Sequence, residues 1–135
     1  MNVKRYYTPV EANRAIAGIE PLVRGLSDRT EALRDLGRSG GDGRPPVDTL
    51  VDPQYFRELM ALSEDLQRLK QYGCVLKDLE TGIVDFPARL EGRDVLLCWR
   101  LGEESISHWH EVDSGFRGRQ PIDTAQCFEG ESSEA

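Results

Sequence analysis

The stretch DVLLCWRLGEESISHWHEV, residues 94–112, decides the fold because its side chains alternate as they do on a β-strand, then turn and alternate again. A strand over 94–101 points successive side chains to opposite faces. One face is apolar and is expected to lie on the helices: Val95, Leu97, Trp99 and Leu101. The other face carries Leu96, Cys98 and Arg100, so any polar site is expected there.

Three neighbouring segments share this period of two: residues 74–79, 83–86 and 106–112. Short turns at Thr81-Gly82, Glu91-Gly92 and Gly102-Glu103 separate the four segments. Pro87 directly follows the second segment, and because proline lacks an N–H it marks a sheet edge or the end of pairing. The pattern therefore predicts a small antiparallel β-meander of three to four strands.

Helical periodicity precedes the strands. Thr8 and Glu11 form a capping box around Pro9, and apolar residues then recur every three or four positions as far as Leu36. A second helix is expected to begin after Asp52 and to end before Gly73. Its predicted apolar face consists of Phe56, Leu59, Met60, Leu62, Leu66 and Leu69. The sequence predicts an α+β fold: a long antiparallel helical hairpin packed on the meander.

The domain boundaries follow from composition. Residues 1–125 are expected to form one domain. Within it, the glycine- and proline-rich residues 37–46 are interpreted as a mobile connector between the helices. Residues 126–135 contain acidic side chains and no Lys or Arg, and are interpreted as a disordered tail.

The net charge and the pattern of cysteines limit the classes of binding partner and the compartment expected for this protein. The chain has 135 residues, 17 Lys plus Arg against 24 Asp plus Glu, and a net charge of −7, which disfavours nucleic acid. The longest apolar run is Val95 to Trp99, too short for a membrane span. The start of the sequence lacks the apolar region of a secretory signal, and the three cysteines have no paired spacing. These features predict a cytoplasmic protein with reduced thiols.

Two histidines, His108 and His110, lie two residues apart and share one face of the last predicted strand. With an even loop before that strand, both imidazoles enter the apolar face. With an odd loop, Cys98 lies opposite His108 and Trp109 joins the core, and we favour this register because it buries the tryptophan. Cys98, His108 and His110 are then candidate zinc ligands, completed by Asp113 or water. The alternative is a pair of half-exposed surface histidines.

The same face suggests two further uses. Cys98, Arg100, Glu103 and His110 are candidate catalytic residues, with positive charge lowering the pKa of a partly accessible thiol. Asp85, Arg117 and Arg119 are candidate ligand-binding residues, because two arginines between glycines can bind one carboxylate or phosphate. The alternatives are an inert core cysteine and arginines that pair with Asp78, Asp85 or Glu103.

Several strings resemble the uncharacterised prokaryotic family called domain of unknown function 2203. They are YTPVEAN (7–13), KDL (77–79), GIVDFP (82–87), CWRLGE (98–103), WH (109–110) and GFRGRQP (115–121). The resemblance implies no activity. An aromatic residue often stands in that family where His108 stands here, which makes His110 the better candidate ligand.

Two classes of function follow. The first is a protein that binds a small anionic ligand or a metal ion such as zinc on the meander, with enzymatic activity left open. The second is a protein–protein interaction module that acts through its helical hairpin and has no catalytic activity. In either class, the apolar edge that a small sheet leaves uncovered predicts a homodimer.

Overall fold

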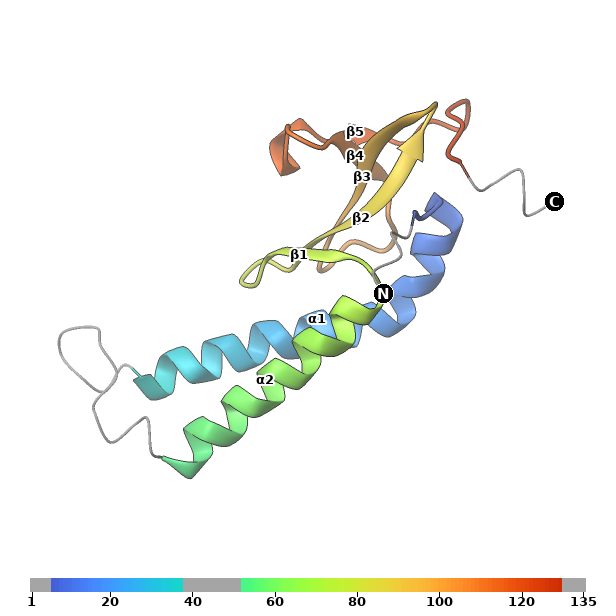
Figure 1. The fold of residues 1–135 in the computed structure, drawn as a ribbon. Coiled ribbons are helices and arrows are strands. Elements are labelled where there is room, and N and C mark those ends of the chain that lie inside the picture. The colour runs from blue at the N-terminus through green and yellow to red at the C-terminus, as the bar shows by residue number, and fades with distance from the viewer. Residues whose placement is uncertain (1–5, 38–51, 130–135) are drawn as a thin grey trace.

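The computed structural model describes residues 6–37 and 52–129 and contains two helices beside one sheet. Helix α1 spans Pro9–Gly37 and α2 spans Pro53–Gln71. The two helices lie side by side and antiparallel, and the sheet packs where α1 begins and α2 ends (Figure 1). The α+β class and the helical hairpin are therefore confirmed. Neither helix combines the length and apolar character that crossing a membrane requires within these described ranges.

Both predicted helix starts are present. The backbone N–H of Thr8 donates to Glu11 Oε1 at 3.0 Å, and the N–H of Glu11 donates to Thr8 Oγ1 at 3.1 Å. Asp52 Oδ1 accepts from the N–H of Gln54 at 2.9 Å. These bonds satisfy donors that the first turn of a helix leaves without partners, which is why each helix begins at its proline.

Over the described residues the sheet has five antiparallel strands in sequence order, one or two more than the sequence indicated. They are β1 (Val75–Asp78), β2 (Ile83–Leu90), β3 (Arg93–Arg100), β4 (His108–Glu111) and β5 (Gln120–Pro121). A short 3-10 turn, η2 (Phe116–Gly118), lies between β4 and β5. The fifth strand escaped prediction because two residues, one of them a proline, show no periodicity.

Strand β2 continues through Pro87 to Leu90 instead of stopping at Phe86. Pro87 lies beyond the end of β1, so its missing N–H faces no neighbouring strand there. Its carbonyl accepts the backbone N–H of Tyr7 at 2.7 Å. Pro87 therefore marks a sheet edge, one of the two roles expected for it, while pairing with β3 continues.

The main core lies between α1 and the apolar face of the sheet. The buried side chains of α1 are Ala12, Ile16, Ile19, Val23 and Leu26. They pack with buried residues of the sheet that include Val84, Phe86, Val95, Leu97, Trp99 and Trp109. Full burial of each large apolar side chain contributes roughly 1.5–3 kcal/mol. The predicted assignment of the faces of β3 is confirmed.

The register between β3 and β4 is the favoured odd one. Leu97 lies opposite Trp109, and Cys98 lies opposite His108. Trp109 is 3% exposed and belongs to the core. Gly102, in the loop before β4, has a φ of 105°, a conformation that suits glycine. The prediction based on burying the tryptophan is confirmed.

Helix α2 buries only part of its predicted apolar face, namely Leu69 and, partly, Leu62. Phe56, Leu59, Met60 and Leu66 are exposed, and the buried residues are Asp65 and Leu69. Asp65 accepts from Arg29 of α1 at 3.3 Å and from Arg68 at 3.0 Å. The side of α2 toward α1 is thus partly polar. The buried side of this helix therefore coincides only in part with the side on which its apolar residues recur.

The start of the predicted tail is part of the fold. Phe128 is 1% exposed, and it pairs with Leu90 as an isolated bridge. The N–H of Glu129 donates to the carbonyl of Arg89 at 2.9 Å. Assigning 126–129 to a disordered tail was therefore wrong, because a single buried aromatic anchors this segment. Residues 130–135 and the predicted connector beyond Gly37 lie outside the described residues.

Candidate metal site on the sheet

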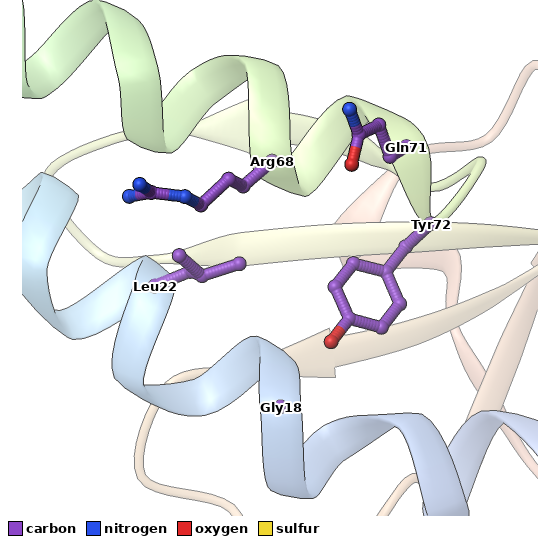
Figure 2. Close-up of a pocket in the computed structure, with 5 residues that line it drawn as sticks. All are labelled: Gly18, Leu22, Arg68, Gln71 and Tyr72. Atoms are coloured by element: carbon purple, nitrogen blue, oxygen red, sulfur yellow. The ribbon is translucent and has the colours of Figure 1, made fainter.

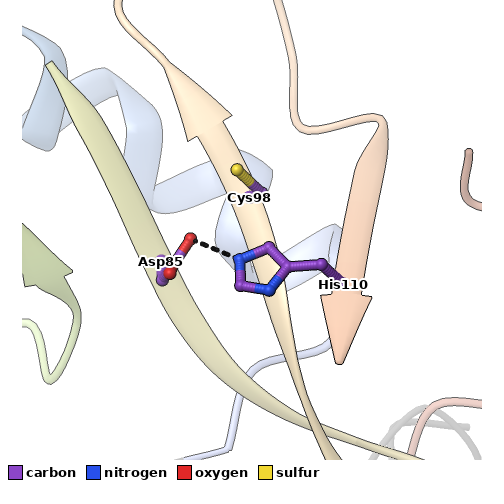
Figure 3. Close-up of side chains that lie close together, drawn as sticks. All are labelled: Asp85, Cys98 and His110. Carbon is purple, nitrogen blue, oxygen red and sulfur yellow. Dashed lines mark hydrogen bonds and ion pairs between the residues drawn. The ribbon is translucent and has the colours of Figure 1, made fainter. Parts of the chain in front are cut away.

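Three adjacent strands bring Asp85, Cys98 and His110 together on the sheet face opposite α1 (Figure 3). Each residue offers one ligand atom, and the three atoms lie within 4.8 Å of one another. The side chains are 1%, 0% and 2% exposed, respectively. Buried polar groups must satisfy one another or bind an ion, because water does not reach them freely.

Hydrogen bonding fixes the ring of His110. Its Nδ1 lies 2.7 Å from the carbonyl oxygen of Glu111, and its Nε2 lies 3.1 Å from Asp85 Oδ1. A carbonyl only accepts, so Nδ1 carries a hydrogen and donates it. One more positive species, a proton or a metal ion, must then lie between Nε2 and the carboxylate of Asp85.

Cys98 is not the accessible, acidic thiol that the sequence suggested. Burial and the neighbouring charge of Asp85 raise the pKa of Cys98 to about 12, although a hydrogen bond and the charge of Arg119 lower it. Arg100, the expected source of positive charge, points to solvent. The thiol therefore stays protonated near neutral pH in the absence of a metal ion.

The geometry also disagrees with nucleophilic catalysis by Cys98. A thiol nucleophile needs a base within hydrogen-bond reach. Both ring nitrogens of His110 are already engaged, by Glu111 and by Asp85. His110 therefore has no free nitrogen to take the proton of Cys98.

The donor set suits zinc. One sulfur, one imidazole nitrogen and one carboxylate oxygen are established zinc ligands, and two anionic ligands neutralise a dication. A zinc-binding histidine usually donates its second ring N–H to a carbonyl or carboxylate, as Nδ1 of His110 does. The 3.1 Å between Nε2 and Asp85 Oδ1 is close to the roughly 3.3 Å that tetrahedral bond lengths give.

Of the three predicted metal ligands, the structure brings Cys98 and His110 together but leaves His108 apart. His108 is half-buried, and its Nδ1 lies 3.0 Å from the hydroxyl of Ser107. It is not part of the buried group, where Asp85 takes its place. Asp113, the expected additional ligand, is exposed.

A sequence signal for Asp85 did exist. Leu90 pairs with Arg93, so Glu91 and Gly92 form a two-residue turn, with φ values of 51° and 88°. Such a turn fixes the register of the whole hairpin. Counting back from it places Asp85 opposite Cys98.

Arg119 and Glu103 form the best-defined ion pair near the site. The guanidinium donates to both carboxylate oxygens, at 3.2 and 2.7 Å, and lies 4.2 Å from the ring centre of Phe116. Burial raises the pKa of Glu103, but hydrogen bonds from Arg119 and the backbone of Arg100 outweigh it, so the pKa is lowered overall. The two predicted anion-binding arginines do not converge, because Arg119 is held by Glu103 while Arg117 is exposed.

A separate cavity of about 520 Å³ lies between the helices (Figure 2). Gly18, Leu22, Arg68, Gln71 and Tyr72 line it, and none of them was a predicted site residue. Arg68 pairs with Asp65 at 3.0 Å. A Cβ atom added to Gly18 would lie 2.2 Å from the hydroxyl oxygen of Tyr72, and this close approach accounts for the glycine.

Fold and site together define a small α+β protein with a buried Asp–Cys–His group. A protein-family model described as an uncharacterized conserved protein, domain of unknown function 2203, matches residues 5–122. The chain belongs to this family, as its motifs suggested. Comparisons with curated proteins and with solved structures give no match.

Proposed function

We propose that this chain binds one divalent transition-metal ion, zinc by preference, through Asp85 Oδ1, Cys98 Sγ and His110 Nε2. The observation that carries the proposal is the ring of His110. Its Nδ1 is fixed on the carbonyl of Glu111, which directs Nε2 toward Asp85 with Cys98 beside them. The ion would take the place of the proton between His110 and Asp85.

The proposed ion has a structural role. Its ligands come from β2, β3 and β4, so one ion would cross-link three strands that pair only through backbone bonds and side-chain packing. All three side chains are at most 2% exposed, which leaves none of them available to a substrate in solution. The proposal therefore includes no reaction. A reducing compartment such as the cytoplasm would keep the Cys98 sulfur available as a ligand.

Elemental analysis and native mass spectrometry of the purified protein test the proposal. We expect one zinc per chain, retained in Cys127→Ser and His108→Asn and lost in Cys98→Ser and His110→Asn. The two control variants alter the exposed cysteine and the histidine outside the buried group. A natural protein that binds no zinc, even when zinc is added to the chelator-treated chain, would overturn the proposal.

The exposed face of α2 supports a second function, that of an interaction module. Phe56 and Met60 are 57% and 48% exposed, and Leu59 and Leu66 lie on the same side of the helix. We propose that a second copy of this chain covers this face, because two-fold symmetry brings identical apolar faces together. Analytical ultracentrifugation of the natural chain and of the Leu66→Glu variant tests whether this dimer forms.

A further inference from the structure

We infer that Arg119 is a positioning residue of the proposed metal site: held by Glu103, it donates a hydrogen bond to the Cys98 sulfur and strengthens metal binding. This inference rests on the proposed function. It adds an interaction outside the ligand set, and it assigns a role to the Glu103–Arg119 pair that the three ligands themselves do not explain.

The topology places Arg119 over the site. Strand β5 pairs with β4 so that Pro121 lies opposite His108, in the row that also holds Cys98. Arg119 is two residues before Pro121 and has extended backbone angles, so its side chain leaves the same face of the sheet. Burial raises the pKa of the Cys98 thiol, and the neighbouring Arg119 guanidinium opposes this larger effect by lowering the pKa, as expected of a cation close to the sulfur.

Three contacts hold the guanidinium in place. Glu103 binds it through both carboxylate oxygens, and the ring of Phe116 lies beneath it. Glu103 is itself fixed, because its Oε1 also accepts the backbone N–H of Arg100 at 2.8 Å. The Arg119 side chain is consequently only 18% exposed. A donor fixed in this way loses little side-chain entropy when it acts on the sulfur.

The charges explain why a cation is tolerated beside a metal ion. A thiolate, a carboxylate and a dication sum to zero, and Arg119 is neutralised by Glu103. An arginine keeps its protons and cannot itself ligate the metal, so it acts only as a donor. Hydrogen bonds to ligand atoms typically change metal affinity 10–100-fold.

The test compares Arg119→Met with Arg117→Met in the full-length chain. Arg117 is the matched control, since it is exposed and lies two residues away. Zinc dissociation constants come from competition with a chromophoric chelator, and the thiolate-to-cobalt absorption band of the cobalt-loaded protein reports on the sulfur. We expect Arg119→Met to bind zinc roughly 10–100-fold more weakly and to shift the band. Arg117→Met should match the natural chain, and Arg119→Lys should restore part of the affinity.

Failure of the proposed metal binding and failure of the inferred role of Arg119 give different results. If the natural chain binds neither zinc nor cobalt, the proposed function itself is wrong. If the natural chain binds zinc and Arg119→Met binds it equally well with an unchanged band, only the role of Arg119 is overturned. Should Arg119→Met not fold, Glu103→Gln and Arg119→Lys carry the test, and zinc affinity and cobalt spectra equal to those of the natural chain in both variants overturn the inference.

Discussion

His110 Nε2 reaches diagonally across β3 to lie 3.1 Å from Asp85 Oδ1, so two residues 25 positions apart in sequence share one buried proton or one metal ion. Neither residue directly opposes the other in the strand register. The contact between His110 and Asp85 therefore depends on the direction of the two side chains as well as on the pairing of the strands.

Replacing His110 with Ala should destabilise the metal-free protein by roughly 3–5 kcal/mol, because it leaves the carboxyl of Asp85 buried without its partner. His108→Ala on the same strand should cost less than about 1 kcal/mol, since His108 is half-buried, lies outside the buried group and has its Nδ1 3.0 Å from the hydroxyl of Ser107. Urea denaturation of both variants gives the two free energies. Equally small losses of unfolding free energy in the two variants would contradict the buried interaction between His110 and Asp85.

Thiol labelling should find only one rapidly reacting cysteine in the native protein. Cys127 is exposed, whereas Cys74 and Cys98 are buried and have pKa values raised to about 11 and about 12. At pH 8 we expect one fast equivalent with a chromogenic disulfide reagent and three after denaturation. Cys127→Ser should abolish the fast phase, and a fast phase that survives in this variant would show that Cys98 or Cys74 is accessible.

Stability should fall at alkaline pH. The pKa of Cys98 is raised by burial from 9.0 in the unfolded chain to about 12 in the fold. This preference for the neutral thiol stabilises the fold fully below pH 9 and is lost as pH rises from 9 through 12. Cys74 acts in the same direction. The free energy of unfolding, measured in urea between pH 8 and 11, should therefore decrease less steeply in Cys98→Ser than in Cys127→Ser. Identical slopes would count against a buried Cys98 thiol.

Two glycines of α1 should respond to alanine in opposite ways. At Gly18 a Cβ would lie 2.2 Å from the hydroxyl oxygen of Tyr72, so Gly18→Ala should cost about 1–3 kcal/mol. At Gly25 the nearest atom is Asp65 Oδ2 at 3.5 Å, an ordinary contact, so Gly25→Ala should stabilise the helix by about 0.5–1 kcal/mol. Thermal melting of the two variants distinguishes them, and a stabilised Gly18→Ala would refute the close approach of Tyr72.

A charge on the exposed face of α2 should disrupt the proposed dimer. Leu66→Glu would place an unpaired carboxylate in the apolar contact between two copies, and should shift the chain to monomers at tens of micromolar. Ala17→Glu, at an exposed position of α1, is the control and should leave the dimer intact. Analytical ultracentrifugation measures both. A natural chain that sediments as a monomer would remove the basis for the dimer.

Local patterns in the sequence determined the helix starts and the faces of the strands. The capping box of Thr8 and Glu11 and the Asp52 cap depend on residues within one helical turn, so they appear in the sequence as they do in the fold. The alternation around Trp99 separated the core face from the polar face. The need to bury Trp109 was enough to favour the correct register between β3 and β4.

Tertiary structure decided which polar residues meet and what their chemistry is. The local turn at Glu91 and Gly92 aligns Asp85 with Cys98, but His110 meets Asp85 only because its ring extends across β3. Arg119 comes close to the site only because β5 pairs with β4. Periodicity assigns a side chain to a face but does not say which row it occupies or what covers it. Segments distant in sequence bury Cys98 and so raise the pKa of its thiol, whereas no segment of the described chain covers the apolar side of α2. No local pattern in the sequence encodes which side chains become covered.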